Sequence, residues 1–421
     1  MRVTGFEVTD VRFPTSAEHH GSDAMHTDPD YSCAYLVLST DGEHTGHGFT
    51  FTLGRGTEIV CAAVRSLVPS VVGADAESLF ADLGGLSRRL TSDSQMRWIG
   101  PEKGVLHLAT AAVLNAVWDL YAKARGKPLW ELVALMSPEE QIGLIDFRYL
   151  TDALTPRHAL EVLKAAEPSR ADRVAELRER GIPAYITSAG WIGYPEDEVR
   201  RRCRQAIADG FTSLKMKVGA DPGTDGARAA VMRSEIGDLT LMMDANQVWD
   251  VGEAIEAMDG LAVFDPWWIE EPTSPDDVLG HARIAEAVAP IKVATGEMCH
   301  NRVMFKQFLQ AQAMGICQID SCRLGSVNEV LAVLLLAERF GVPVCPHAGG
   351  VGLCEYVQHL AAIDAIAVCG TTDGRVVEFA DHLHEHFVHP AQVKDGSYRL
   401  PEEPGYSAEM HAASLREYNY A

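Results

Sequence analysis

The fold follows from six apolar runs within residues 211–347: LKMKV at 214–218, LMMDAN at 241–246, WWIEEP at 267–272, VATGE at 293–297, CQID at 317–320 and VCPH at 344–347. Each run carries an ionisable residue at or near its end, and these residues are Lys217, Asp244, Glu270, Glu297, Asp320 and His347. Successive members are 27, 26, 27, 23 and 27 residues apart. One strand, one helix and two loops occupy about that length, so the spacing predicts a parallel α/β barrel with its functional residues at the carboxyl ends of the strands.

Three successive strand ends carry the carboxylates Asp244, Glu270 and Glu297. A single acidic residue after a strand is usually a helix cap or a solvated loop residue. Three at equal steps converge on one point, and hard carboxylate oxygens favour Mg²⁺. In WWIEEP the adjacent Glu270 and Glu271 point to opposite faces, and the period favours Glu270 as the ligand.

Lys215 and Lys217 lie two residues apart on one strand, so both side chains point to the same face. Solvent-facing lysines on an edge strand would show the same alternation. If the face is the barrel interior, two neighbouring ammonium groups beside a dication lower each other's pKa towards the range of a general base.

Asp320 and His347 end consecutive strands and are therefore expected to be neighbours. A carboxylate beside an imidazole orients the ring and stabilises its protonated form, which suits His347 to donate a proton. The alternative is a hydrogen-bonded core histidine. Glu378, in VVEF after the expected eighth strand, would lie at the same mouth of the barrel.

Composition limits the class of protein. The chain has 421 residues, 47% of them hydrophobic, and a formal net charge of −23. This charge argues against nucleic acid or an anionic membrane as a partner. The nine cysteines include no CxxC pair, and we see no secretory or membrane-spanning segment, so we expect reduced thiols in the cytoplasm.

Residues before the barrel predict a separate α+β unit. Alternating apolar residues indicate antiparallel strands at 3–13 and at 33–52, the latter broken at Asp41-Gly42, and a long polar loop at 19–31 lies between them. Helical spacing follows at 57–90 and 104–125. We predict a capping domain at 1–130, a connecting segment at 131–182, the barrel at 183–380 and a C-terminal segment at 381–421 that packs back on the first domain. In the connecting segment we expect a short strand at 142–149 and a helical stretch at 156–180.

Two other motifs favour a plainer interpretation. DHLHEH at 381–386 has histidine spacing that could bind zinc, but it lies beyond the last strand and indicates a solvated face. The glycine-rich stretch at 349–352 lacks the further glycine and the downstream acid of a dinucleotide site, and would instead let backbone amides approach an anionic ligand.

The chain resembles the mandelate racemase-like subgroup of the enolase superfamily, and within it most closely the L-fuconate dehydratases. The Lys-x-Lys pair, the three carboxylates and the Asp–His pair carry the general resemblance. The closer one rests on VRFPTS at 11–16, AMHTDPDYS at 24–32, RWIGPEKGV at 97–105, HLATAAVLNAVWDL at 107–120, IEEPTSPDD at 269–277, QIDSCRLGSVNE at 318–329 and PVCPHAGGVGLCE at 343–355.

This resemblance implies a (β/α)7β barrel under an N-terminal capping domain, one Mg²⁺ held by the three carboxylates, and dehydration of L-fuconate to 2-keto-3-deoxy-L-fuconate. Lys217 would remove the proton of carbon 2, His347, paired with Asp320, would protonate the leaving 3-hydroxyl, and Lys215 would neutralise the substrate carboxylate. The implied substrate contacts, besides Lys215 and His347, are Gly21, Ser22, Asp23, Tyr31, Glu297, Gly349 and Glu378. A homo-oligomer is also expected.

Three other functions remain open from the residues alone. Another sugar-acid dehydratase, or a racemase, epimerase or cycloisomerase, of the same superfamily would share the metal site and the first step. A non-catalytic protein that binds acid sugars would not require Lys217 and His347. A zinc hydrolase on a similar barrel would want His-x-His on the first strand, where Tyr185-Ile-Thr187 stands instead.

Overall fold

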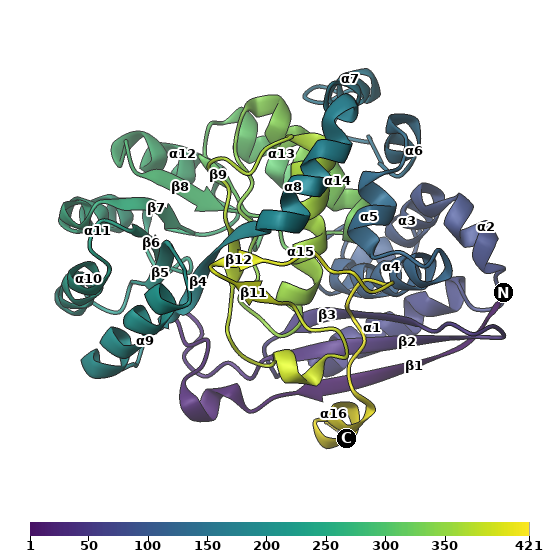
Figure 1. Ribbon diagram of the computed structural model, residues 1–421, viewed down its shortest axis with the longest axis horizontal. Coiled ribbons are helices and arrows are strands. Elements are labelled where there is room, and N and C mark those ends of the chain that lie inside the picture. Colours follow the sequence, from purple (N-terminus) through teal and green to yellow (C-terminus); the bar gives the residue numbers. More distant parts are fainter. Residues whose placement is uncertain (421) are drawn as a thin grey trace.

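The computed structural model describes residues 1–420 and begins with a three-stranded antiparallel sheet. Its strands, in spatial order, are β1 (Val3–Arg12), β2 (Ser32–Thr40) and β3 (Gly46–Thr52). Helix α4 (Gly104–Ala124) packs directly on β3. The approach is close because Gly46 and Gly48 have no side chain: a Cβ on either would meet the backbone of Ala116. This sheet and its helices form one layered unit, drawn in purple and blue in Figure 1.

The stretch at 57–90 is divided into short helices. They are α1 (Thr57–Leu67), α2 (Ala76–Ala81) and α3 (Leu83–Thr91). Pro69 lies in a 3₁₀ turn after α1, and Gly73 takes a positive φ of 81° before α2. Asp75 and Asp82 then cap the next two helices by accepting hydrogen bonds from backbone N–H groups.

Helix α4 is the one helix among residues 1–420 that is long and apolar enough to cross a membrane. In the folded chain 83% of its most apolar window is buried inside the protein. Its apolar character is therefore explained by its place in the core, between the sheet and the barrel helix α14 (Ser326–Phe340).

The predicted (β/α)7β barrel with an N-terminal α+β domain is confirmed. The barrel strands are β4 (Ile182–Gly190), β5 (Ser213–Lys217), β6 (Thr240–Asp244), β7 (Pro266–Glu270), β8 (Lys292–Thr295), β9 (Ile316–Cys317) and β10 (Val377–Phe379). Neighbouring strands pair in parallel, a single bridge from Cys317 to Val344 supplies the seventh position, and β10 closes the ring on β4.

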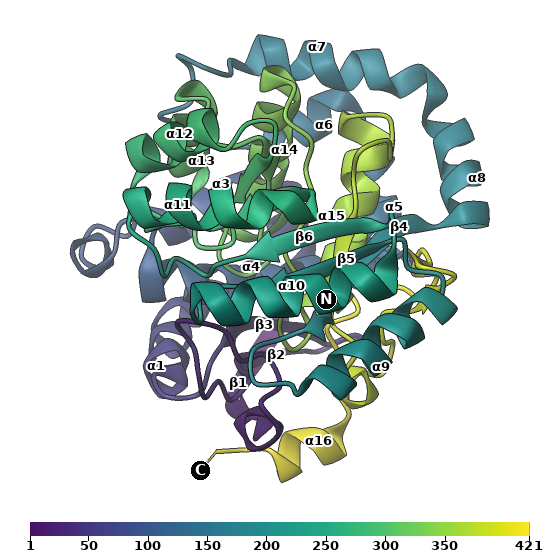
Figure 2. The same ribbon diagram turned by 90° about the vertical axis from the view of Figure 1, so that its left-hand side faces the viewer.

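Seven helices cover the outside of the barrel. They are α9 (Glu196–Ala208), α10 (Pro222–Ile236), α11 (Val251–Leu261), α12 (Val278–Ala287), α13 (Arg302–Gln310), α14 and α15 (Leu353–Ile363), the last continued by a π-helical turn at Asp364–Val368. Figure 2 shows α9, α10 and α11 lying side by side along the outer face.

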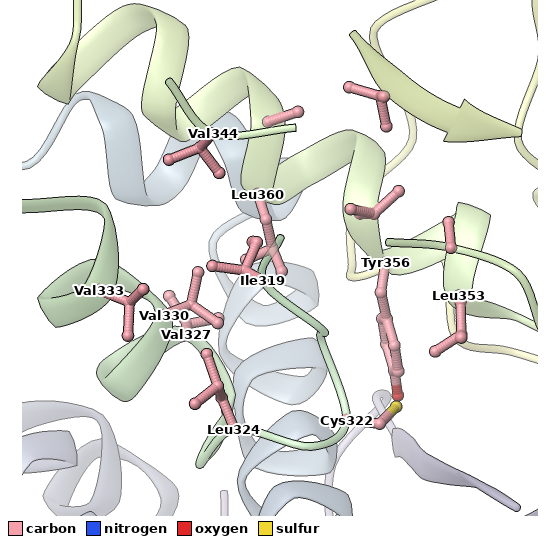
Figure 3. Close-up of a cluster of buried hydrophobic side chains, with 14 of the residues drawn as sticks. Ile319, Cys322, Leu324, Val327, Val330, Val333, Val344, Leu353, Tyr356 and Leu360 are labelled. Atoms are coloured by element: carbon pink, nitrogen blue, oxygen red, sulfur yellow. The ribbon is translucent and has the colours of Figure 1, made fainter. Parts of the chain in front are cut away.

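The core joins the two units. Val327, Val330 and Val333 recur at three-residue steps on α14 and meet apolar residues of the loop that follows β9 (Figure 3). Inside the barrel a second cluster fills the lumen with Tyr185, Met242, Trp268, Ala294, Ile316 and Cys345. The barrel is thus a packed core with its open end facing the capping unit.

The connecting segment is helical and contains no strand. Its helices are α5 (Leu129–Ala134), α6 (Pro138–Gly143), α7 (Pro156–Ala166) and α8 (Arg170–Arg180). The prediction of a strand at 142–149 is wrong. The carbonyls of Asp146 and Arg148 accept hydrogen bonds from the guanidinium of Arg302, so this backbone is used in a polar cluster rather than in a sheet.

The C-terminal segment touches both units. Its hairpin, β11 (Val393–Lys394) and β12 (Ser397–Tyr398), pairs antiparallel with the start of β4. Helix α16 (Ala412–Glu417) leads to residues beside β1, where the N–H of Arg12 donates to the carbonyl of Tyr418 at 2.9 Å. Both termini therefore lie at the capping sheet, as Figure 1 shows.

Candidate active site

A cavity lies where the carboxyl ends of the barrel strands face the capping unit. Nine of the residues predicted from the sequence line it: Gly21, Asp23, Tyr31, Lys217, Glu297, Asp320, His347, Gly349 and Glu378. The other four, Ser22, Lys215, Asp244 and Glu270, do not line it. Ser22 donates a hydrogen bond to Thr27 within its own loop, and the remaining three lie beneath the cavity floor.

The three carboxylates of the predicted metal site come together. Asp244, Glu270 and Glu297 each offer an oxygen, and these oxygens lie within 4.8 Å of one another. Asp244 and Glu270 are fully buried. Burial, together with the charge of Asp244, raises the pKa of Glu270 to about 8. Buried carboxylates this close repel each other, and a divalent cation relieves that repulsion, so the donor set fits a hard metal ion.

Lys215 and Lys217 both point into the barrel, which excludes the edge-strand interpretation. Nζ of Lys215 lies 2.7 Å from Glu270, 2.9 Å from Glu378 and 3.2 Å from Asp244. Nζ of Lys217 lies 2.5 Å from Asp244 and also donates to Asn246 at 2.8 Å. Lys215 thus balances buried negative charge below the cavity, whereas Lys217 reaches the cavity itself.

The expected lowering of the pKa of Lys217 is not what the structure shows. Burial and the charge of Lys215 do lower it, but the carboxylates of Asp244, Asp23 and Glu297 together outweigh them and the pKa is raised. The sequence argument considered only the repulsion between the two ammonium groups, which would lower the pKa of Lys217. The carboxylates packed around the lysines outweigh that repulsion, so the pKa rises instead.

Asp320 and His347 form the expected pair. Nδ1 of the ring lies 2.8 Å from Oδ2 of Asp320, and Nε2 lies 3.5 Å from Glu297. Burial opposes the charged ring, but Glu297, Asp320 and Glu378 together raise the pKa of His347 to about 10. The ring is fully hydrogen-bonded on one side and presents Nε2 to the cavity, which suits proton donation.

Glu378 links the two halves of the site. One of its oxygens faces Lys215, and the other accepts a hydrogen bond from the N–H of Ala348 at 2.8 Å. Burial alone would raise its pKa, but Lys215 and His347 hold it at about 2. Glu378 is therefore a fixed negative charge next to His347.

The capping loop closes the cavity from above. The carboxylate of Asp23 accepts hydrogen bonds from the backbone of Met25 and His26, which folds the loop on itself. Gly21 has a φ of 76° and packs against Tyr31, whose ring also meets Phe51 edge to face. The loop is therefore held by the first domain while it faces the barrel residues.

Further lining residues escaped the sequence argument. They are His26, Phe51, Leu53, Leu108, Thr187, Trp191, Asn246, Met298, Cys322 and Arg323. Asn246 could have been found, because it follows Asp244 by two residues at a strand end. The apolar members carry no signal that separates them from core residues.

A closed barrel under an α+β cap, with a carboxylate triad flanked by a lysine and a histidine, defines a class of enzymes that remove a proton next to a carboxylate. Comparison with known families agrees: residues 7–134 match the mandelate racemase / muconate lactonizing enzyme N-terminal domain, and residues 198–414 match the enolase C-terminal domain-like family. The chain belongs to the mandelate racemase-like group of the enolase superfamily.

Several relatives span the whole chain. L-galactonate dehydratase of Hypocrea jecorina is 54% identical over 100% of this chain and 94% of its own. The structure of human mitochondrial enolase superfamily member 1 superposes with a TM-score of 0.98 at 56% identity, covering 100% of this chain and 96% of the other. A racemase from Streptomyces coelicolor A3(2), solved with bound magnesium, has a TM-score of 0.78 at 25% identity, with 99% of each chain covered.

Proposed function

We propose that the protein is a Mg²⁺-dependent hydro-lyase that dehydrates a six-carbon acid sugar to its 2-keto-3-deoxy acid. The observation that carries this proposal is the placement of Lys217 and His347. Lys217 ends the second barrel strand and His347 follows the seventh, while the carboxylates occupy strands three to five. A base and an acid thus reach one cavity from different sides of the metal site.

The first step is removal of the proton on carbon 2, which is weakly acidic because it lies beside a carboxylate. Lys217 would take this proton as the free amine, a form that a divalent cation on Asp244 would favour by offsetting the carboxylate that raises the pKa of Lys217. Asp244, Glu270 and Glu297 would hold Mg²⁺, which would supply positive charge opposite the negative charge that develops on the substrate carboxylate. The ammonium group of Lys215 is buried among the carboxylates and offsets part of their negative charge.

The second step is loss of the 3-hydroxyl. His347 delivers the proton from Nε2 to the leaving oxygen, so that water departs, and the enol left behind becomes the keto acid. Asp320 holds the ring through Nδ1 and favours its protonated form. Asn246, whose Oδ1 accepts a hydrogen bond from Lys217, and Tyr31 complete the polar lining.

For the substrate we propose L-galactonate or L-fuconate. The resemblance from the sequence pointed to L-fuconate, whereas a relative that spans this chain is named L-galactonate dehydratase. The two acids are the same molecule except that L-fuconate has a methyl group where L-galactonate has a hydroxymethyl group at carbon 6. One site with the same chemistry at carbons 2 and 3 can therefore accept both.

The test is keto-acid formation from these two acids with and without Mg²⁺, followed by semicarbazide absorbance. We expect product from at least one acid and none after chelation of the metal. His347→Asn should still exchange the carbon-2 proton with solvent deuterium, because exchange needs only base and metal, while Lys217→Ala should lose both exchange and product. Normal exchange by the Lys217 variant would contradict these roles.

A racemase, epimerase or cycloisomerase is the second candidate, because it would share Lys217, His347 and the metal site. It would return a stereoisomer or a lactone rather than a keto acid, so proton NMR of the product separates it from a dehydratase. A non-catalytic binding protein would show neither exchange nor product.

Other features stay predictions. These are the homo-oligomer, the cytoplasmic location and the domain limits at residues 130, 182 and 380. The name of the human relative, mitochondrial enolase superfamily member 1, does not support the cytoplasmic location.

A further inference from the structure

Arg323 is a cation in the cavity wall that the proposed mechanism does not use. Its Nε donates to the carbonyl of Glu297 at 3.3 Å, and its Nη2 contacts the thioether of Met298 at 3.1 Å. A guanidinium has five N–H groups, and a thioether is a weak acceptor. Within residues 1–420 the side chain forms no ion pair with a carboxylate, in contrast to Arg302, which binds both Glu102 and Glu329.

The position of Arg323 is fixed relative to the reacting groups. Its backbone N–H donates at 2.7 Å to Oδ1 of Asp320, the carboxylate whose other oxygen binds His347. Two residues later the N–H of Gly325 donates at 2.7 Å to Glu329. The loop that carries Arg323 is therefore held at both ends, and the guanidinium is a preorganised donor.

The site geometry indicates which part of a substrate meets this donor. Carbons 1 to 3 are placed by the metal site, Lys217 and His347 at the strand ends. Arg323 and Met298 lie further along their loops than Asp320 and Glu297. The rest of the chain of an acid sugar must extend towards the capping unit, where the lining residues Phe51, Leu53 and Leu108 are apolar. Hydroxyls that enter there need a polar partner.

We propose that Arg323 is a specificity-determining residue that donates hydrogen bonds to the hydroxyls on carbons 5 and 6 of the acid sugar. This inference rests on the proposed function. It explains why an arginine without a carboxylate partner is kept half-buried beside apolar residues: a six-carbon substrate supplies the missing acceptors, and a shorter acid leaves the N–H groups unpaired.

The experiment compares Arg323→Met with the wild type on three acids: L-galactonate, L-fuconate and a four-carbon aldonic acid with the same configuration at carbons 2 and 3. We expect kcat/KM to fall by about 10- to 100-fold for the six-carbon acids, as for hydrogen bonds to a charged group, and to change far less for the four-carbon acid. Equal losses on L-galactonate and L-fuconate assign the bond to the 5-hydroxyl, and a loss on L-galactonate alone assigns it to the 6-hydroxyl.

Two controls keep the test decisive. Arg88→Met, an exposed arginine on α3, should leave the ratio of six-carbon to four-carbon activity unchanged. If Arg323→Met is inactive on every acid, calorimetric binding of the same three acids replaces the kinetic ratio, with the melting temperature as a check on folding. Equal losses for four- and six-carbon acids would overturn the role of Arg323, whereas a wild type that dehydrates none of them would overturn the proposed function itself.

Discussion

At the residue scale, His347 shows how its neighbours decide a role. The same side chain in an apolar core would be neutral, because burial disfavours the imidazolium. Here Glu297, Asp320 and Glu378 raise its pKa to about 10 despite that burial. Mg²⁺ bound to Glu297 would cancel part of this effect, so the contribution of Asp320 is the one that persists during turnover.

Asp320→Asn should therefore move the alkaline limb of the kcat/KM profile to lower pH. His347 acts as an acid below its pKa, and removing an opposite charge 2.8 Å from Nδ1 lowers that pKa by about one to three units. The profile of keto-acid formation between pH 6 and 10 is the measurement. An alkaline limb that stays in place would show that Asp320 only orients the ring.

The residue pattern predicted the site residues that end strands, and the family resemblance added contacts in the capping loop such as Asp23 and Tyr31. Lys217 and Asp320 stand out because they belong to a series of ionisable residues that recurs once per strand and helix. Arg323 and Leu108 follow no period, and their distance from the reacting groups depends on how two units meet. That information is absent from any local pattern.

At the element scale, the same contrast holds for secondary structure. The barrel strands were predicted because short apolar runs recur at a regular step, and α4 because a long apolar stretch ends before Gly126. The prediction of a strand at 142–149 is wrong because a distant side chain bonds this backbone: the guanidinium of Arg302 donates hydrogen bonds to the carbonyls of Asp146 and Arg148. Hydrogen bonds to a distant side chain are invisible in the local sequence.

This polar cluster joins the connecting segment to α13 and α14. Arg302 is 4% exposed and bonds Glu102 at 2.9 Å and Glu329 at 3.1 Å. Arg302→Leu would remove the guanidinium that bridges these two buried carboxylates, leaving Glu329 with His107 and Glu102 with the more distant Arg148. We therefore expect the free energy of unfolding to fall by about 3 kcal/mol.

Urea unfolding of Arg302→Leu measures this effect. Arg157→Leu is the matched control, because Arg157 pairs with Glu161 on the surface of α7 with 85% of its side chain exposed. Exposed pairs contribute about 0–1 kcal/mol, so the control should unfold almost as the wild type does. Equal effects of the two substitutions would refute a structural role for the cluster.

The capping loop allows a second test at this scale. Gly21 has a φ of 76°, and a Cβ there would collide with the ring of Tyr31. Gly21→Ala should therefore displace Tyr31, raise KM or lower kcat for the sugar, and leave Mg²⁺ affinity unchanged, because the carboxylates belong to the barrel.

Gly73→Ala provides the control for backbone strain alone. Gly73 has a similar φ of 81°, but a Cβ there would meet nothing within 4 Å. Steady-state kinetics of both variants separate the collision from the strain. Wild-type kinetics in Gly21→Ala would assign the loop a structural role only.

At the scale of the whole molecule, the metal site should control stability as well as activity. Three carboxylate oxygens within 4.8 Å repel one another in the folded protein. A cation that binds them relieves this repulsion, and because it binds only the folded state it stabilises that state. We expect Mg²⁺ at about 100 times its Kd to add about 2.7 kcal/mol to the free energy of unfolding.

Glu270→Gln should abolish this stabilisation, because it removes one of the three charged ligands while keeping the shape of the side chain. Glu271→Gln should retain it, since the neighbouring Glu271 bonds Gln247 and lies outside the triad. Thermal melting with and without Mg²⁺ is the measurement. Stabilisation that survives in Glu270→Gln, or activity that survives exhaustive EDTA treatment, would contradict the assignment of the site.

The C-terminal segment pairs with the first barrel strand through β12 and with the capping strand β1 through Tyr418. These residues are synthesised after the cap and the barrel. The barrel and the cap can each collapse during synthesis, but the pairing of the C-terminal segment with both forms only after that segment has left the ribosome. A nascent chain stalled shortly before residue 393 would therefore carry every proposed catalytic group and still lack this pairing, so that the onset of activity would report the synthesis of the C-terminal segment.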